Sequence, residues 1–106
     1  MLKWKPISVT ALTTVEELEV VLIGMAGKNR IIKYAALSSR DGRRHLRVYR
    51  DAEQFVDVPM DVLTDESPLL PMDLPLTEGQ FCNIGFYNGS PGTETVVITI
   101  GYEETG

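Results

Sequence analysis

The chain has 106 residues, of which 43% are hydrophobic and 24% charged, and it carries a formal net charge of −5 at pH 7. This length leaves room for one hydrophobic core and no second domain, so we expect a single domain over residues 1–106. No apolar run approaches the roughly 18–20 residues of a membrane span, and no apolar stretch typical of a secretory signal follows the first lysines.

The first part of the chain is predicted to begin with an arm, followed by a segment that could form either a helix or a strand. Residues 1–13, approximately, are expected to form an N-terminal arm. The spacing in Thr14–Glu17 matches a capping box, which would begin a helix ahead of the apolar run. Leu18, Val20 and Leu22 nevertheless lie at alternate positions, and the run around them is mostly β-branched, which favours a strand. A helix over residues 14–23 remains the alternative.

Regular alternation of apolar and polar residues predicts three further strands. The clearest is the last one, since its alternate positions are β-branched or aromatic. The side chains that we expect to face the core in these strands are Leu46 and Val48; Ile84 and Phe86; and Val96, Ile98, Ile100 and Tyr102. The tail, residues 103–106, is expected to fray.

Turn residues separate the predicted strands at short intervals. The Asp41-Gly42 pair is typical of a hairpin, and further turns are expected at residues 24–29, 77–80 and 88–92. Residues 57–75 differ, because four prolines exclude a long helix or a central strand there. We expect a long, irregular, acidic connection with short edge pieces. The whole pattern predicts an all-β fold, a single-domain β-sandwich of the jelly-roll or Greek-key type.

The charges are segregated along the chain. Residues 28–50 contain eight Lys or Arg and one Asp, whereas residues 51–106 contain eleven Asp or Glu and no cation. One interpretation is that oppositely charged strands lie beside each other in the fold. A second is a self-complementary or partner-docking surface. A third is nucleic-acid binding by the basic region, with His45 and Tyr49 available for stacking, although the negative net charge argues against it.

Residues with catalytic potential are isolated in the sequence. His45 is the only histidine and is expected on an exposed strand face. The sequence does not indicate a carboxylate that would orient it or a nucleophile that it would activate. Cys82 is the only cysteine, so the chain cannot form an intrachain disulfide. A single cysteine also indicates a reducing cytoplasm, and we expect Cys82 to be a small, partly buried hydrophobic residue. One Cys and one His do not complete a zinc site, and the acidic residues of the proline-rich segment match no EF-hand. We therefore expect no enzyme, no catalytic residues and no metal or cofactor site.

The segment Leu74–Asn88 combines an apolar-Pro-apolar run, a Glu-Gly turn, a strand and an Asn-Gly turn, ahead of a final Thr/Val/Ile-rich strand. In this it resembles small jelly-roll proteins of tailed-phage particles, such as capsid decoration (cement) proteins and head or tail accessory proteins. The resemblance covers about the last third of the chain. It implies a homo-oligomer, commonly a trimer, that bridges neighbouring subunits of the major capsid protein. It also implies a place in the virion after synthesis in the host cytoplasm.

The predicted function is that of a non-enzymatic structural or interaction protein, with a viral particle accessory as the specific hypothesis. The alternatives are a small carbohydrate- or ligand-binding sandwich that stacks sugars on exposed aromatic residues, and nucleic-acid binding through residues 28–50. Trp4 is a candidate anchor, because an N-terminal arm can add a strand to a neighbour. The other candidate partner contacts are Arg40, Arg43, Arg44, Arg47 and Arg50 on one side and Asp61, Asp65 and Glu66 on the other.

Overall fold

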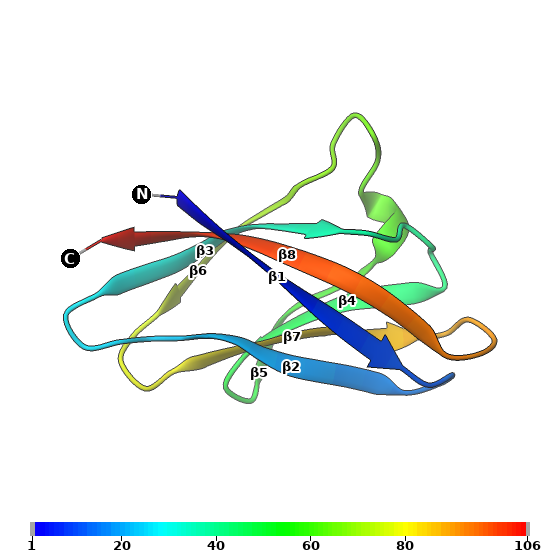
Figure 1. Ribbon diagram of the computed structural model, residues 1–106, viewed down its shortest axis with the longest axis horizontal. Helices are drawn as coiled ribbons and strands as arrows, with labels where there is room; N and C mark the ends of the chain where they lie inside the picture. Colours follow the sequence, from blue (N-terminus) through cyan, green and yellow to red (C-terminus); the bar gives the residue numbers. More distant parts are fainter. Residues whose placement is uncertain (1, 106) are drawn as a thin grey trace.

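The computed structural model describes residues 2–105, which form two four-stranded antiparallel sheets packed face to face (Figure 1). In chain order the elements are β1 (Leu2–Ala11), β2 (Glu16–Ile23), β3 (Asn29–Leu37), β4 (Arg44–Arg50), β5 (Glu53–Pro59), the 3-10 helix η1 (Met60–Val62), β6 (Leu70–Leu76), β7 (Phe81–Asn88) and β8 (Glu94–Thr105). Sheet A has the order β1-β8-β3-β6 and sheet B the order β2-β7-β4-β5. The predicted all-β sandwich is confirmed, and its strand order is that of a jelly roll.

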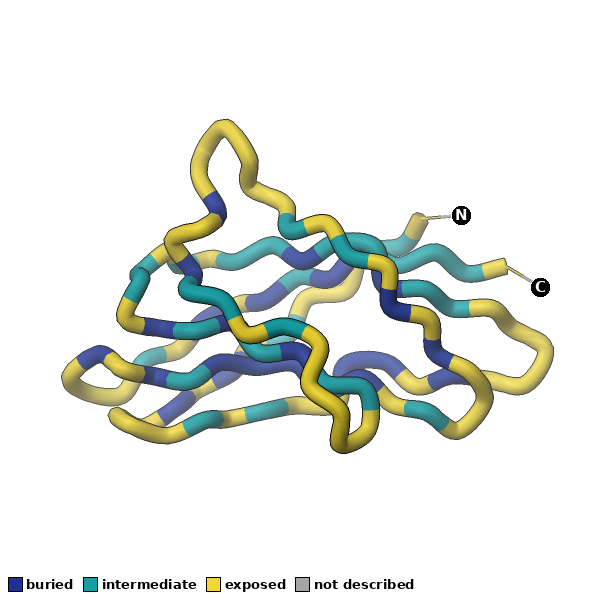
Figure 2. Tube along the Cα trace, turned by 180° about the vertical axis from the view of Figure 1, so that it is seen from behind, coloured by how far each residue is buried: buried dark blue, intermediate teal, exposed yellow. Residues whose placement is uncertain are grey.

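The core lies between the two sheets and follows the expected alternation (Figure 2). The predicted core residues are fully buried in the middle of β4, β7 and β8, and Tyr102 is partly buried against them. Phe86 is the largest of the fully buried side chains. Side chains of a strand alternate between its two faces whatever the strand's neighbours are, which explains why these positions were predictable.

Residues 14–23 contain a strand, so the helix alternative is wrong. β2 pairs with β7, but its register shifts between Val20 and Leu22, where the strand has a β-bulge. Val21 and Leu22 are therefore both buried, whereas Val20 faces solvent. Simple alternation had grouped Val20 with Leu22, and the extra residue of the bulge places them on different sides.

Both ends of the chain are more ordered than expected. β1 pairs with β8 over its whole length, so the prediction of an N-terminal arm is wrong for residues 2–11. The reason is that Val9 and Ala11 are buried between the sheets, and this burial stabilises the strand. β8 continues to Thr105 between β1 and β3, so the predicted fraying is wrong for residues 103–105. Gly106 lies outside the described residues.

The connections mostly cross between the sheets. The Asp41-Gly42 turn leads from β3 of sheet A to β4 of sheet B, so the predicted hairpin is wrong. The hairpin that the structure contains joins β4 to β5, and Asp51 adopts a φ of 53° there. An Asp-Gly pair indicates a local chain reversal, but packing decides which sheet receives the next strand.

The acidic, proline-rich segment is only partly irregular. β5 extends to Pro59, and β6 forms at the edge of sheet A with Pro71 and Pro75. An edge strand accommodates proline because one row of its N–H groups has no strand to bond. The expected edge pieces are thus confirmed, whereas the irregular connection shrinks to residues 63–69, which protrude from the sandwich (Figure 1). Across residues 2–105 the structure contains no helix long and apolar enough to cross a membrane.

Candidate interaction surfaces

The basic segment folds against the acidic residues of the same chain. Of its eight cations, six contact a carboxylate, through the pairs Arg30–Glu104, Lys33–Asp73, Arg40–Asp65, Arg43–Asp41, Arg44–Glu94 and Arg47–Glu16. Arg50 instead lies over the ring of Phe55 and donates to the carbonyl oxygen of Pro75. The interpretation that oppositely charged strands lie beside each other is therefore confirmed. The more exposed of these pairs, Lys33–Asp73 and Arg40–Asp65, each add little to the stability of the fold, because solvent screens exposed charges.

Arg47 is the centre of a polar network on the outer face of sheet B. Its Nη1 donates to Glu16 at 2.6 Å and its Nε to Asp57 at 3.3 Å, so it links β2, β4 and β5. The hydroxyl of Tyr49 donates to the same Glu16 carboxylate at 3.1 Å. The register places Gly85 opposite Arg47, and without a side chain there the guanidinium can cross β7 to β2. The hydrogen bond to Glu16 raises the pKa of Arg47.

Arg44 is buried, and its guanidinium binds partners within the same chain. Its guanidinium donates to the hydroxyls of Ser39 and Ser90 and lies 3.3 Å from the Glu94 carboxylate. These partners belong to the β3–β4 connection, the β7–β8 connection and the start of β8. Arg44 thus ties one end of the sandwich together and has little surface left for a partner.

The remaining predicted contact residues lie close to one another at the β3–β4 connection and the protruding loop. Arg40 pairs with Asp65, and Arg43 pairs with Asp41. Asp61 lies beside Gly42 and is exposed, as is Glu66, and neither belongs to an ion pair within residues 2–105. The predicted basic contact residues and the predicted acidic ones therefore lie beside each other within one chain. Their contact with a partner stays a prediction.

Trp4 lies on the outer face of sheet A and is 48% exposed. Its indole covers Gly101, where an added Cβ would meet the ring at 2.7 Å, and it stacks with Tyr34 at a ring separation of 6.1 Å. The next positions across this face are Pro6 opposite Thr99 and Ser8 opposite Val97, all uncharged. Trp4 is thus an ordered part of its own sheet, which corrects its predicted place on an arm.

Exposed apolar side chains gather at one end of β2. Val20 and Ile23 are 52% and 51% exposed, and the half-exposed Met25 follows them in the next connection. Phe81 of β7 lies directly opposite Ile23 and is also exposed. This group was not predicted from the sequence. Four consecutive apolar residues in one strand could have indicated it, because an edge strand cannot bury both of its faces.

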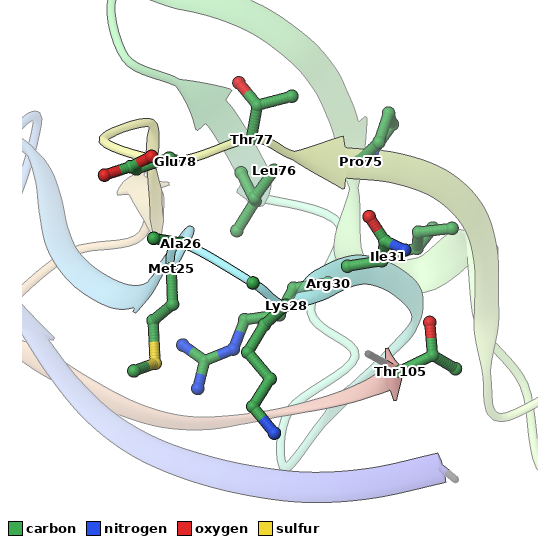
Figure 3. A pocket seen from close by; sticks show the side chains of 12 residues that line it. Met25, Ala26, Lys28, Arg30, Ile31, Pro75, Leu76, Thr77, Glu78 and Thr105 are labelled. Carbon is green, nitrogen blue, oxygen red and sulfur yellow. The ribbon is translucent and has the colours of Figure 1, made fainter.

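Two clefts border the same end of β2. The larger, of about 430 Å³, lies between the β2–β3 connection and the β6–β7 turn and is lined in part by Met25, Lys28 and Glu78 (Figure 3). The smaller, of about 240 Å³, lies between Lys5 of β1, residues 20–23 of β2 and Arg30 of β3. Both clefts combine apolar walls with cationic side chains.

His45 and Cys82 lie on opposite faces of sheet B, His45 at its outer face and Cys82 in the core. The Nδ1 of His45 lies 3.2 Å from Asp57 at the outer face of sheet B. Cys82 is a small hydrophobic residue as predicted, but it is fully buried in the core and not partly exposed. No group of three or more potential metal ligands occurs in the part of the chain that the structure describes.

Burial raises the pKa of the Cys82 thiol to about 12. Because the thiolate is the reactive species, we expect Cys82 to resist a thiol-specific reagent at pH 8 until the protein unfolds. The labelling rate, followed spectroscopically against denaturant concentration, should therefore track unfolding. Rapid labelling without denaturant would show that β7 opens locally.

Glu104 joins both neighbours of β8. Lys3 of β1 donates to its Oε1 and Arg30 of β3 to its Oε2, each at 2.7 Å, and these hydrogen bonds lower its pKa from 4.5 to about 2. A folded-state pKa below the unfolded value stabilises the protein above pH 4.5, and this contribution is lost as the pH falls towards 2.

We therefore expect Glu104→Gln to unfold more easily than wild type at pH 7 and to lose less stability between pH 4.5 and 2. Thermal unfolding across this range measures both effects. Glu78→Gln is the control, because Glu78 is exposed and has no ion-pair partner among residues 2–105. Parallel pH profiles for wild type and Glu104→Gln would contradict the assignment.

Neither a protein family nor a curated protein matches the sequence. Among solved structures, the nucleoplasmin-like N-terminal domain of Drosophila FKBP39 is similar, with 14% sequence identity and a TM-score of 0.53. The alignment covers 100% of this chain and 92% of that one. At this identity the similarity shows a shared fold.

Proposed function

We propose that the protein is a non-enzymatic interaction module that assembles with further copies of itself. The observation that carries this proposal is the group of exposed apolar side chains around the end of β2, Val20, Ile23, Met25 and Phe81. A contiguous apolar patch is unfavourable in water and marks a contact site in a soluble domain. A second copy offers the same patch, so association buries both.

The charge distribution favours this partner over nucleic acid. Most cations of residues 28–50 are already paired with carboxylates of the same chain. Binding to phosphates would have to break these pairs and overcome a net charge of −5. An uncharged contact avoids both costs.

Sedimentation velocity over a range of concentrations tests self-assembly. We expect wild type to exceed the 11.8 kDa mass of one chain, and Val20→Lys to weaken association at least about tenfold, since a buried charge is costly. Val62→Lys is the matched control, because Val62 is 48% exposed on η1. A monomer at all concentrations up to about 1 mM, a range typical of weak contacts, would exclude the proposal.

The resemblance of Leu74–Asn88 to decoration proteins supports a narrower form of the proposal. In that form the protein belongs to a tailed-phage particle and binds the major capsid protein, with a trimer as the expected assembly. Co-sedimentation with purified capsid shells tests this form. Failure to bind any shell would leave self-assembly intact but exclude the capsid role.

Trp4 and Tyr34 favour carbohydrate binding as a second candidate. Their stacked rings, one half-exposed and lying over Gly101, provide an apolar surface on which a sugar ring can stack. Trp4 is the only tryptophan, so its fluorescence reports directly on such binding. Titration with glycans should change the emission of wild type and not that of Tyr34→Ala. Unchanged wild-type emission with every glycan would exclude this function.

A further inference from the structure

The charges along the β2 edge follow an order from acidic to basic. Glu17 and Glu19 are exposed near the beginning of the strand, and neither belongs to an ion pair in the described part of the chain. Lys5 and Lys28 likewise form no ion pair within residues 2–105 and border the two clefts at the other end of the strand. The apolar patch begins at Val20, between the two charged ends along the strand. Val20 and Ile23 lie on the outer face of sheet B, whereas Glu17 and Glu19 lie on the inner side of the same edge, opposite Phe86 and Ile84.

The basic end of this edge contains three cationic side chains around the two clefts, Lys5, Lys28 and Arg30. Lys5 and Arg30 line the smaller cleft together with residues 20–23, and Lys28 and Arg30 line the larger one with Met25. Figure 3 shows the side chains of Met25, Lys28 and Arg30 extending to the same side of the β2–β3 connection. An anionic side chain that enters this region would therefore meet cations beside an apolar wall.

This order is self-complementary under a two-fold rotation. β2 is an edge strand of sheet B, and a rotated copy would run antiparallel to it. Glu17 and Ile23 lie about 10 Å on either side of Val20 along the strand, given a rise of about 3.3 Å per residue. A two-fold axis near Val20 therefore brings the acidic end of each copy to the basic end of the other.

We propose that a second copy docks edge-on along β2 about this axis, with Glu17 and Glu19 of each copy at Lys28 and Lys5 of the other. The apolar residues Val20 and Ile23 of both copies meet on the outer side of the same edge. The proposal rests on the self-assembly proposed above and names its surface. The contact uses side chains, because the bulge between Val20 and Leu22 interrupts the strand edge that a continuous intermolecular sheet would need.

Charge reversal followed by sedimentation velocity tests the contact at low and at high salt. Glu17→Lys alone and Lys28→Glu alone should each weaken association at least tenfold, because each places like charges opposite one another. Glu17→Lys combined with Lys28→Glu should restore it. Glu53→Lys is the matched control on the β5 edge, where the exposed Glu53 has no ion pair among residues 2–105. Thermal unfolding verifies that each variant is folded.

Each result bears on a different part of the proposal. Loss in the single variants, recovery in the double variant and weaker association at high salt would support the β2 contact. An associating wild type that is insensitive to both single reversals, or a double variant without recovery, would overturn this surface and leave self-assembly standing. A trimer would likewise exclude the two-fold contact. A strictly monomeric wild type would remove the proposed function together with this contact.

Discussion

Replacing Gly85 by alanine is expected to lower the free energy of unfolding by about 3–5 kcal/mol, at the upper end of single-substitution effects. A Cβ at this position would lie 1.8 Å from the carbonyl oxygen of Glu17 and 2.9 Å from the Cα of Leu18. Both atoms belong to the backbone of β2, so neither can move away without breaking the pairing of β2 with β7. Such a loss is a large part of the roughly 5–15 kcal/mol that stabilises a small domain.

Denaturant unfolding measures this loss, and Gly27→Ala provides the matched control. Gly27 has a φ of 74° and no atom within 4 Å of an added Cβ, so the same substitution costs backbone strain without a clash. We expect about 1–2 kcal/mol there. Equal midpoints for Gly85→Ala and wild type would show that β2 does not approach β7 this closely.

Asn88→Ala is expected to cost about 3 kcal/mol, because Asn88 is fully buried and each orphaned buried group costs about 1–3 kcal/mol. Its Nδ2 donates to the carbonyl oxygens of Ala11 at 3.0 Å and Gly92 at 2.9 Å. Its Oδ1 accepts from the backbone N–H of Ser90 at 3.0 Å. Asn88 thus joins the end of β1 to the β7–β8 connection, and its loss leaves three backbone groups without their partner.

Asn88→Asp distinguishes the hydrogen bond that Asn88 accepts from the two that it donates, through the pH dependence of stability. The aspartate keeps the acceptor for Ser90 but turns an ionised oxygen towards the carbonyls of Ala11 and Gly92, which raises its folded-state pKa. Because a raised carboxyl pKa makes the folded state less stable as the pH rises, the deficit relative to wild type should be large at pH 7. It should shrink as the pH falls towards about 4.

Chemical denaturation at both pH values measures the difference between Asn88→Asp and wild type. Asn83→Ala, on the outward face of the same strand, is the control and should change stability by less than about 1 kcal/mol. A pH-independent deficit in Asn88→Asp would mean that the two carbonyls do not face this side chain.

The core was largely predictable from the sequence, whereas the candidate contact surface was not. Ile84, Phe86 and Ile98 are buried as their alternation predicts, because the two faces of a strand follow from the backbone alone. Val20 and Leu22 did not follow the same rule, since the bulge between them places Leu22 in the core while Val20 faces solvent. A bulge depends on how β2 packs against β7, so it cannot be predicted from the residues of β2 alone.

Alternation and turn spacing along the chain predicted a β-sandwich, and the order of charged residues showed that positive and negative charges occupy different segments. Which charges meet depends on how those segments pack in the folded protein. Glu104 meets Lys3 and Arg30, which are 101 and 74 residues away in the chain, because the jelly-roll order places β8 between β1 and β3. Most of the basic segment is neutralised in this way. The order of strands arises from packing between distant segments, so the exposed end of β2 became visible only in the folded chain.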